Sequence, residues 1–183
     1  MLTISKIRTL LPQEAYTVSI DLTDAYWHIP INRNFSPYLG FKLGRKGYQF
    51  KAMPFGLNIA PRIFTKLTES VVQQLRKKGL QVLAYLDDWL VWTESKEKCL
   101  KAVLEVMKFL QSLGFQINFK KSRLKPSQVF QWLGILWDLK SHTLTIPPPK
   151  RKEIASSVRR LIKLKPLTRR QQEKVLGSLQ LQQ

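Results

Sequence analysis

The sequence predicts an α+β fold in which an antiparallel sheet packs on helices. Three observations favour this class: short alternating strand-like runs, two amphipathic helical stretches between them, and turn residues at the junctions. The chain has 183 residues, of which 44% are apolar and 23% charged. That length and composition suit one globular domain, or one domain and part of a second, and exclude global disorder.

Strands are expected wherever side chains alternate. Residues 16–22 alternate and include β-branched residues, which predicts a strand with Asp21 near its end. The apolar runs 80–86 and 89–92 predict a hairpin with Asp87 and Asp88 at its tip. Further strands are expected as a pair within 35–53 around the turn 44–47, and at 115–119, 129–137 and 144–146.

Two helices are expected between these strands. The first should begin near Pro61, because proline suits the first helical turn, and Gly79 stands where a C-terminal glycine belongs. Its expected apolar stripe is Phe64, Leu67, Val71 and Leu75. The second helix should cover residues 96–113 and end at Gly114. Its expected apolar face is Leu100, Val103, Leu104, Met107 and Leu110.

The chain is strongly basic. It has 31 Lys and Arg against 12 Asp and Glu, a net charge of +19, which points to a polyanionic partner, most often nucleic acid. Residues 140–183 hold 11 basic and 2 acidic side chains. Beyond the boundary at 147–149 two basic helices are expected, the second beginning at Thr168. The apolar face expected on the first is Ile154, Val158, Leu161 and Ile162.

Several classes of protein are excluded by what the sequence lacks. No apolar run approaches the roughly 20 residues needed to cross a bilayer, and the N-terminus does not read as a signal peptide. A single cysteine, Cys99, leaves no disulfide framework, and two histidines with one cysteine are too few for a typical zinc site. We therefore expect an intracellular protein of the cytoplasm or nucleus, not secreted, with no membrane.

The aspartates are few and grouped. Of five, four fall in two clusters, Asp21 with Asp24 and Asp87 with Asp88. The dipeptide alone could equally be a solvated turn. If the strand that ends in Asp21 lies beside the hairpin, however, three carboxylates converge, and such oxygen ligands select Mg²⁺ or Mn²⁺. Two ions about 3.5–4 Å apart are the clamp of phosphoryl transfer, which suggests a polymerase or a nuclease.

Four segments resemble, in order, motifs A, B, C and E of reverse transcriptases. They are residues 19–26 (Ser-Ile-Asp-Leu-Thr-Asp-Ala-Tyr), 54–57 (Pro-Phe-Gly-Leu), 85–88 (Tyr-Leu-Asp-Asp) and 132–134 (Trp-Leu-Gly). The resemblance extends from about residue 5 to residue 180. A two-metal nuclease does not explain motifs B and E. Residues 21–30 and 87–90 look most similar to the DIRS-like group of retrotransposon enzymes, and Phe55 stands where lentiviral enzymes use Gln.

The resemblance implies a polymerase palm over residues 1–147, with a fingers-type insertion at about 29–60. It implies the start of a basic helical thumb at 148–183. The implied activity is RNA-directed DNA polymerisation, by two-metal-ion transfer of a nucleotide from a dNTP to a primer 3′-OH on an RNA or DNA template. The implied partners are a primer–template and dNTPs, with two Mg²⁺ ions, or Mn²⁺, as cofactors.

The resemblance also assigns roles to single residues. Asp21, Asp87 and Asp88 would be the catalytic carboxylates and hold the metal. Lys121, in the motif D stretch 114–121, would protonate the leaving pyrophosphate; the alternatives are a solvated lysine or its neighbour Lys120. The substrate-binding residues would be Leu22, Asp24, Ala25, Tyr26, Phe55, Gly56 and Tyr85. The primer grip would be Trp132, Leu133 and Gly134.

Among the substrate-binding residues, Tyr26 would be the steric gate that excludes a 2′-hydroxyl, its alternative being an ordinary aromatic core residue. The Leu22 carbonyl would complete the nucleotide-side ion, and Phe55 with Gly56 would pack under the incoming base. Trp132 could likewise be simply a core aromatic. For His28 we expect a structural role.

The sequence departs from the family pattern at both ends. Only 20 residues precede Asp21, where the family places fingers strands with Lys and Arg, and the chain stops within the expected thumb. The chain thus looks like a catalytic centre cut at both ends, a polyprotein fragment or a host-retained copy. The alternative function is a truncated or domesticated, non-catalytic nucleic-acid-binding module with the same fold.

Overall fold

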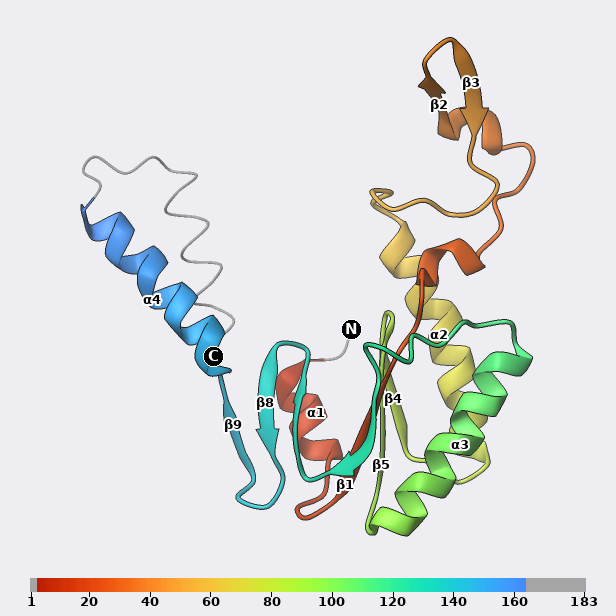
Figure 1. The fold of residues 1–183 in the computed structure, drawn as a ribbon. Helices are drawn as coiled ribbons and strands as arrows, with labels where there is room; N and C mark the ends of the chain where they lie inside the picture. Colours follow the sequence, from red (N-terminus) through yellow and green to blue (C-terminus); the bar gives the residue numbers. More distant parts are fainter. Residues whose placement is uncertain (1–2, 164–183) are drawn as a thin grey trace. The chain divides into compact units, whose positions relative to one another are not determined.

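The computed structural model describes residues 3–163, and the chain divides into two compact units, 1–128 and 129–183. The first unit contains α1 (Ile4–Leu10), β1 (Tyr16–Asp21), the 3-10 helices η1 (Ala25–His28) and η2 (Ser36–Leu39), β2 (Gly40–Leu43), β3 (Lys46–Gln49), α2 (Ala60–Lys77), β4 (Val82–Tyr85), β5 (Asp88–Thr93), α3 (Lys96–Ser112) and β6 (Arg123–Ser127) (Figure 1). The described part of the second contains β7 (Val129–Trp132), β8 (Ile135–Asp138), β9 (Thr143–Thr145) and α4 (Pro148–Lys163). The α+β class is confirmed.

A four-stranded antiparallel sheet forms the centre of the first unit, in the order β4-β5-β1-β6. Helices α2 and α3 lie on one side of it and α1 on the other (Figure 1). The register pairs Val18 with Val91 and Ile20 with Trp89, and these apolar side chains join the core beneath α2 and α3. Since side chains alternate along a strand, the residues between them face the opposite side.

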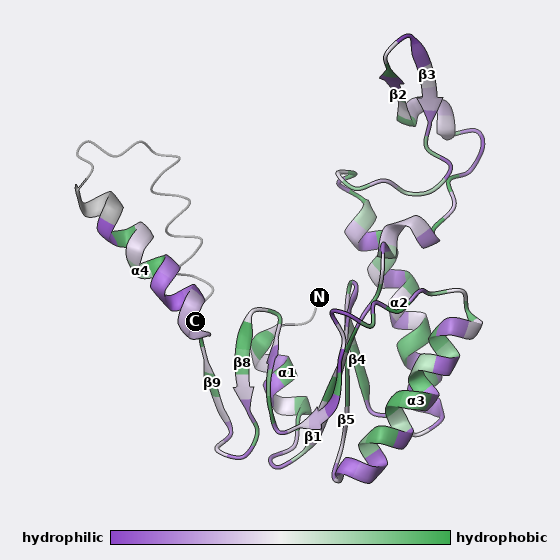
Figure 2. Cartoon of the chain, in the orientation of Figure 1, coloured by the Kyte–Doolittle hydropathy of each residue, from purple (hydrophilic) through white to green (hydrophobic). Residues whose placement is uncertain are grey.

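The two long helices begin and end close to the expected residues, but their buried faces differ from the predictions. On α2 the stripe holds Phe64, Val71 and Leu75, whereas Leu67 is 38% exposed and Thr68 is buried. On α3, which alternates hydrophobic and hydrophilic stripes (Figure 2), the buried face is Cys99, Ala102, Val103, Val106, Met107 and Leu110. The predicted Leu100 and Leu104 are exposed. Small residues at 99 and 102 allow a closer approach to the sheet than two leucines would.

Both helices end in the same glycine motif. In α3 the Leu110 carbonyl accepts from the Phe115 N–H (3.0 Å) and Gln111 from the Gly114 N–H (2.9 Å). In α2 the Leu75 carbonyl accepts from the Leu80 N–H, and the Arg76 carbonyl accepts from the Gly79 N–H. Gly79 and Gly114 have φ of +83° and +87°, which side chains rarely adopt.

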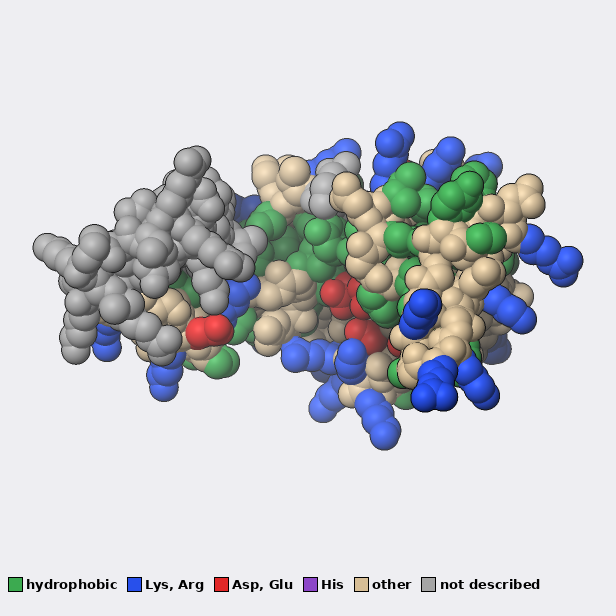
Figure 3. All heavy atoms as spheres, turned by 90° about the horizontal axis from the view of Figure 1, so that it is seen from above, with side chains coloured by type: hydrophobic (Ala, Val, Ile, Leu, Met, Phe, Trp, Pro, Cys, Tyr) green, Lys and Arg blue, Asp and Glu red, His purple; other side chains and the backbone are tan. Residues whose placement is uncertain are grey.

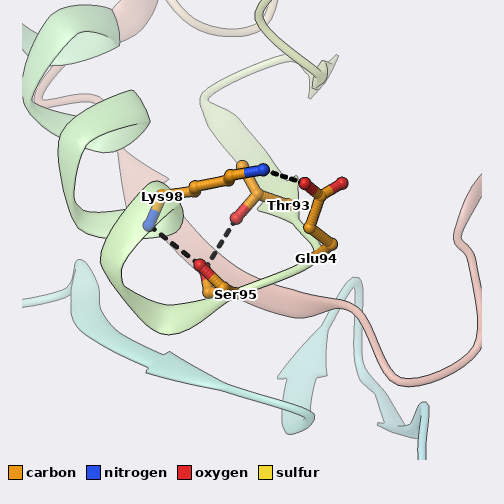
Figure 4. Close-up of polar contacts among 4 residues, drawn as sticks. All are labelled: Thr93, Glu94, Ser95 and Lys98. Carbon is orange, nitrogen blue, oxygen red and sulfur yellow. Dashed lines mark hydrogen bonds and ion pairs between the residues drawn. The ribbon is translucent and has the colours of Figure 1, made fainter.

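The start of α3 is fixed by a side-chain cap (Figure 4). The Ser95 hydroxyl accepts from the Lys98 N–H at 3.2 Å, and the Thr93 hydroxyl donates to the Ser95 carbonyl at 2.9 Å. The Lys98 ammonium also contacts the Glu94 carboxylate. Both of these side chains are exposed, so the ion pair adds little beside the cap.

Several strand predictions need correction. Residues 115–119 form no strand, because Phe119 is exposed and only one bridge, Leu22 to Ile117, is made. The expected strand 129–137 is two strands, β7 and β8, joined by a turn at Leu133–Gly134 with φ of +52° and +74°. In the β4–β5 hairpin the two-residue loop is Leu86–Asp87, so Asp88 is already in β5. The hairpin within 35–53 is confirmed as β2 and β3.

Other features were not anticipated or lie elsewhere. No pattern predicted α1 or β6. The compact units divide after Gln128, so β7, β8 and β9 group with α4 rather than with the central sheet. The palm–thumb division expected at residue 147 stays a prediction. The helix expected from Thr168 lies outside the described residues. Within residues 3–163 no helix is long and apolar enough to span a bilayer.

The glycine motif gives a direct test of helix termination. Nothing lies within 4 Å of a Cβ added at Gly114, so Gly114→Ala should cost about 1 kcal/mol of unfolding free energy through its positive φ alone. Urea unfolding measures this cost. Gly47→Ala is the matched control, because Gly47 has open space too but no positive φ, and it should cost nothing. Equal effects of the two substitutions would contradict this explanation.

Candidate active site

The centre of the site is a pair of carboxylates on adjacent strands. Asp21 ends β1 and Asp88 begins β5, and the antiparallel register places them directly opposite each other. Directly opposed residues have Cβ atoms about 4.5–5.5 Å apart on the same face. Both are partly buried, on the face opposite Ile20 and Trp89. The convergence of the strand end with the hairpin, predicted from the sequence, is therefore present for these two.

Asp87 lies in the tight loop that joins β4 to β5. Its carbonyl accepts a hydrogen bond from the Leu22 N–H at 3.0 Å, which ties the hairpin tip to the end of β1. The preceding Leu86 has φ of +54°, a conformation that costs a non-glycine residue about 1–2 kcal/mol. Surrounding contacts must supply that energy, so the position of Asp87 beside β1 is held against backbone strain.

The electrostatics of the group show that the three carboxylates interact. Burial raises the pKa of Asp88 from 3.8 to about 6, and the charges of Asp87 and Asp21 act in the same direction. Burial also raises the pKa of Asp21, and the Lys121 ammonium is the largest opposing influence. The Asp87 charge raises this pKa further, whereas a hydrogen bond with the Asn118 side chain lowers it. Lys121, which is exposed, thus lies close enough to favour the charged form of both strand carboxylates.

A loop after α3 fixes β1 from the other side, and sequence reasoning missed its role. The Asp21 carbonyl accepts from the Asn118 N–H at 2.8 Å, and the Ser122 hydroxyl accepts from the Asp21 N–H at 3.0 Å. The Asn118 side-chain oxygen accepts a hydrogen bond from the Lys121 backbone N–H at 3.3 Å. The Asn118 backbone carbonyl accepts one from the Ser122 hydroxyl at 2.7 Å. The spacing Asn-x-x-Lys-Ser is a turn signal that could have identified these residues.

A pocket of about 330 Å³ opens beside the carboxylates. Its lining is Leu22, Thr23, Asp24, Ala25, Tyr26, Phe55, Asp87, Asn118 and Lys121. Five of the seven predicted substrate residues are in this lining. Gly56 and Tyr85 are not, and Tyr85 instead lines a second cavity, of about 610 Å³, with residues of α1, α2 and β4.

The Tyr26 ring forms one wall of the pocket. It packs on Phe55 (centroids 5.1 Å apart) and edge-on against the buried Phe64 (5.5 Å). Burial, with the Asp87 and Tyr85 side chains, raises the pKa of its hydroxyl. The ring is thus fixed by aromatic packing, as the core alternative describes, while it still lines the pocket. The gate role stays a prediction.

The predicted primer grip lies in the second unit. Trp132 is buried at the end of β7, and its carbonyl accepts from the Trp137 indole N–H at 3.1 Å. Leu133 and Gly134 form the turn into β8, and a Cβ added at Gly134 would meet the Lys150 ammonium at 3.0 Å. The core alternative describes Trp132 well; the primer-grip role stays a prediction.

The donor set fits a hard cation partly. Among residues 3–163 no group of three His, Cys, Asp or Glu side chains has the arrangement of a metal site. Asp21 and Asp88, with Asp87 acting on both, offer the one or two carboxylates by which Mg²⁺ is usually bound together with substrate phosphates. In the space-filling view a small group of acidic side chains lies among hydrophobic and other atoms, with Lys and Arg side chains along one side of it (Figure 3).

The raised pKa of Asp88 predicts how stability depends on pH. Between pH 4 and 6 the folded chain binds more protons at Asp88 than the unfolded chain, so the stability that Asp88 contributes is fully present below about pH 4 and is lost as pH rises through about 6. Without metal, this contribution to the free energy of unfolding should drop by roughly 0.5–1 kcal/mol from pH 5 to pH 7.5, because Asp88 is only half buried and solvent screens its charge. Urea unfolding in EDTA measures this.

Asp88→Asn should remove most of that drop. Asp138→Asn is the control, because hydrogen bonds from Ser141 lower the pKa of Asp138, so this carboxyl titrates below the measured range and its removal should leave the drop unchanged. A native chain whose stability does not fall over this range, or an Asp88→Asn chain with the native profile, would contradict the assignment.

Comparison with known proteins places this geometry in a family. The profile of the family described as reverse transcriptase (RNA-dependent DNA polymerase) matches residues 3–136. Protein P of a duck hepatitis B virus is 26% identical over 159 residues, which cover 86% of this chain but 20% of that protein. The genome polyprotein of petunia vein clearing virus is 30% identical over 115 residues, which cover 63% of this chain and 5% of that one.

Solved structures agree on the fold. A foamy viral protease–reverse transcriptase in complex with double-stranded DNA superposes with a TM-score of 0.77 at 22% identity, covering 93% of this chain and 28% of that one. The same kind of protein with an RNA/DNA hybrid gives 0.72 at 24% identity, covering 92% and 21%. A family profile that matches most of the chain identifies it as a member of the reverse transcriptase family.

Proposed function

We propose that this chain is the catalytic core of an RNA-directed DNA polymerase. It would transfer a nucleotide from a dNTP to a primer 3′-OH on an RNA or DNA template. The observation that carries the proposal is the cross-strand pair of Asp21 and Asp88, with Asp87 beside them in a pocket walled by Tyr26 and Phe55. A non-catalytic binding module would not explain why the chain keeps a group of carboxylates whose mutual repulsion opposes folding.

The three aspartates would hold two Mg²⁺ or Mn²⁺ ions. Bound there, such ions activate the primer hydroxyl and neutralise charge on the transferring phosphoryl group. The chain's own contribution is to keep two carboxylates facing each other and a third beside them. The raised pKa of Asp88 supports this role, because a cation at the site would relieve the repulsion that raises it.

The pocket would receive the incoming dNTP. Tyr26 is held by Phe55 and Phe64, so its ring cannot easily turn away from a 2′-hydroxyl. Phe55, exposed at the pocket mouth, would pack under the base together with Gly56. Leu22 and Ala25 line the same pocket, and Asp24 adds a carboxylate there. Tyr85 lines a different cavity, so we keep for it only its place at the end of β4, paired with Asp88 in the β4–β5 hairpin.

Lys121 is the candidate general acid. It lines the pocket, and its positive charge lowers the pKa of both Asp21 and Asp88. Its ammonium would therefore be close enough to interact with phosphates that react at these carboxylates. It would give its proton to the leaving pyrophosphate oxygen, and solvent can restore that proton because the side chain is exposed.

Primer–template would bind through the basic surface. The net charge of +19 supports a polyanionic partner, and the relatives solved with double-stranded DNA and RNA/DNA hybrid are proteins of the same family fold. We propose that residues 1–147 form the palm, with a fingers-type insertion at about residues 29–60. Residues 148–183 would form the start of the thumb. Residues 132–134 would contact the primer.

Two finer assignments complete the proposal. Residues 21–30 and 87–90 support a DIRS-like or LTR-type retrotransposon origin, whereas the relatives reported above are viral. A polymerase with a single cysteine and a nucleic acid substrate would act in the cytoplasm or nucleus.

Removing one carboxylate tests the metal role. Asp87→Asn should lower primer extension on an RNA template by about 10³-fold, as loss of a preorganised charge does in other active sites. Primer–template affinity should stay within a factor of two, because this carboxylate would serve metal rather than phosphate. Asp138→Asn, which removes a carboxylate in the second unit, is the control. Native extension rates in Asp87→Asn would end the polymerase proposal.

Removing one ring tests the sugar gate. Tyr26→Ala should leave dNTP incorporation working and raise ribonucleotide incorporation relative to it by at least about tenfold, because the clash with the 2′-hydroxyl is lost. Tyr38→Ala removes an 83% exposed tyrosine of η2 and should change nothing. Unaltered sugar selectivity in Tyr26→Ala would refute the gate and leave the carboxylate site standing.

A further inference from the structure

His28 joins two parts of the site that are far apart in the sequence. It ends η1, the 3-10 helix that carries Tyr26. Its Nδ1 lies 3.1 Å from the Ala25 carbonyl, and its Nε2 accepts from the Gln116 backbone N–H at 3.1 Å. A carbonyl can only accept and an N–H can only donate, so the neutral ring carries its proton on Nδ1.

The peptide groups on either side of Gln116 connect this histidine to the carboxylate strand. The Gln116 carbonyl accepts from the Thr23 N–H at 2.8 Å, while its N–H reaches His28. Two residues later, the Asn118 N–H donates to the Asp21 carbonyl at 2.8 Å. The loop after α3 is therefore held to η1 by the imidazole and to β1 by backbone hydrogen bonds.

A path of aromatic contacts returns from His28 to the pocket. The His28 ring packs on Phe115 (5.3 Å between centroids), and Phe115 lies edge-on to Phe64 (6.4 Å). Phe64 in turn supports Tyr26 at 5.5 Å. Tyr26 and His28 thus fix η1 at two points, one against α2 and one against the loop that holds Asp21.

We propose that His28 is a positioning residue for sugar selection: its Nε2 fixes η1 against the loop at 116–118, which sets the distance of the Tyr26 ring from the carboxylates. The inference rests on the proposed nucleotide pocket, and His28 itself does not line that pocket. It acts through the Gln116 N–H and the packing of Tyr26.

If His28 only stabilised the fold, its removal would lower stability and sugar selection together. The positioning role predicts a larger effect on sugar selection. Gln116 is exposed, so its N–H would bind water if His28 were lost, and the fold would lose little stability. The placement of η1 would change more, because the Thr23 and Asn118 bonds tie the loop only to β1 and the residues just after it. Sugar selection should therefore suffer out of proportion to stability.

The first test is spectroscopic and independent of any activity. Nitrogen-15 shifts of the imidazoles in the full chain report which ring nitrogen carries the proton. The chain has two histidines, so in the His142→Gln variant all imidazole signals come from His28. We expect the Nδ1-protonated neutral tautomer for His28. A ring protonated at Nε2 would overturn the proposal whatever the protein's function.

The second test compares two side chains of similar size. His28→Gln keeps an acceptor that can reach the Gln116 N–H, and His28→Leu does not. The dissociation constants of dATP and ATP are measured with Mg²⁺ on a dideoxy-terminated primer–template, where no bond can form. His28→Leu should lower the preference for dATP by about tenfold, the upper range for one hydrogen bond, and His28→Gln should keep it within twofold.

A stability control separates position from folding. Val106→Ala removes a buried side chain of α3 away from the site and should lower the thermal midpoint at least as much as His28→Leu, with native sugar preference. Native preference in His28→Leu, or equal losses in the Gln and Leu variants, would overturn the inference. A native chain that binds neither nucleotide would instead refute the proposed function, and this inference with it.

Discussion

Two carboxylates held opposite each other on neighbouring strands are the constraint on which the rest of this structure depends. Asp21 and Asp88 are partly buried and share one face of the sheet, so their mutual repulsion opposes folding. The opposite face of the same strands carries Ile20 and Trp89, both fully buried under α2 and α3. Because these large apolar side chains fix the register, the strands cannot slip to separate the charges without exposing the core.

Further contacts hold the strand end in that costly position. Leu86 keeps a positive φ so that the Asp87 carbonyl can meet the Leu22 N–H, and Asn118 and Ser122 hydrogen-bond the backbone of Asp21. Local strain that persists against its energetic cost is typical of functional sites. Among the described residues, Asp24 and Leu86 have this strain at the site, but Glu14, Leu133 and His142 have it elsewhere. The strain at Leu86 therefore bears on the site because of the Asp87 contact that it permits.

Much of the fold and the centre of the site could be predicted from the sequence. Alternation gave β1, and the grouping of rare aspartates identified the carboxylates before any geometry was known. The faces of α3 could not be predicted, because Leu100 and Leu104 fit a helical stripe as well as Cys99 and Ala102 do. The choice depends on how closely the helix approaches the sheet. The spacing Asn-x-x-Lys-Ser predicts a turn at Asn118. It does not predict the partner of that turn, because Asn118 hydrogen-bonds the backbone of a residue 97 positions away.

The most direct test of the central claim is to count bound metal ions. Electron paramagnetic resonance of Mn²⁺, with a dideoxy-terminated primer–template and dATP, measures the ions held by the complex beyond those bound by nucleotide alone. The native chain should hold Mn²⁺ at this site, and the double variant Asp21→Asn, Asp88→Asn should lose it while primer–template binding persists. Mn²⁺ binding that is unchanged in the double variant would contradict the claim that the cross-strand carboxylates are a metal centre.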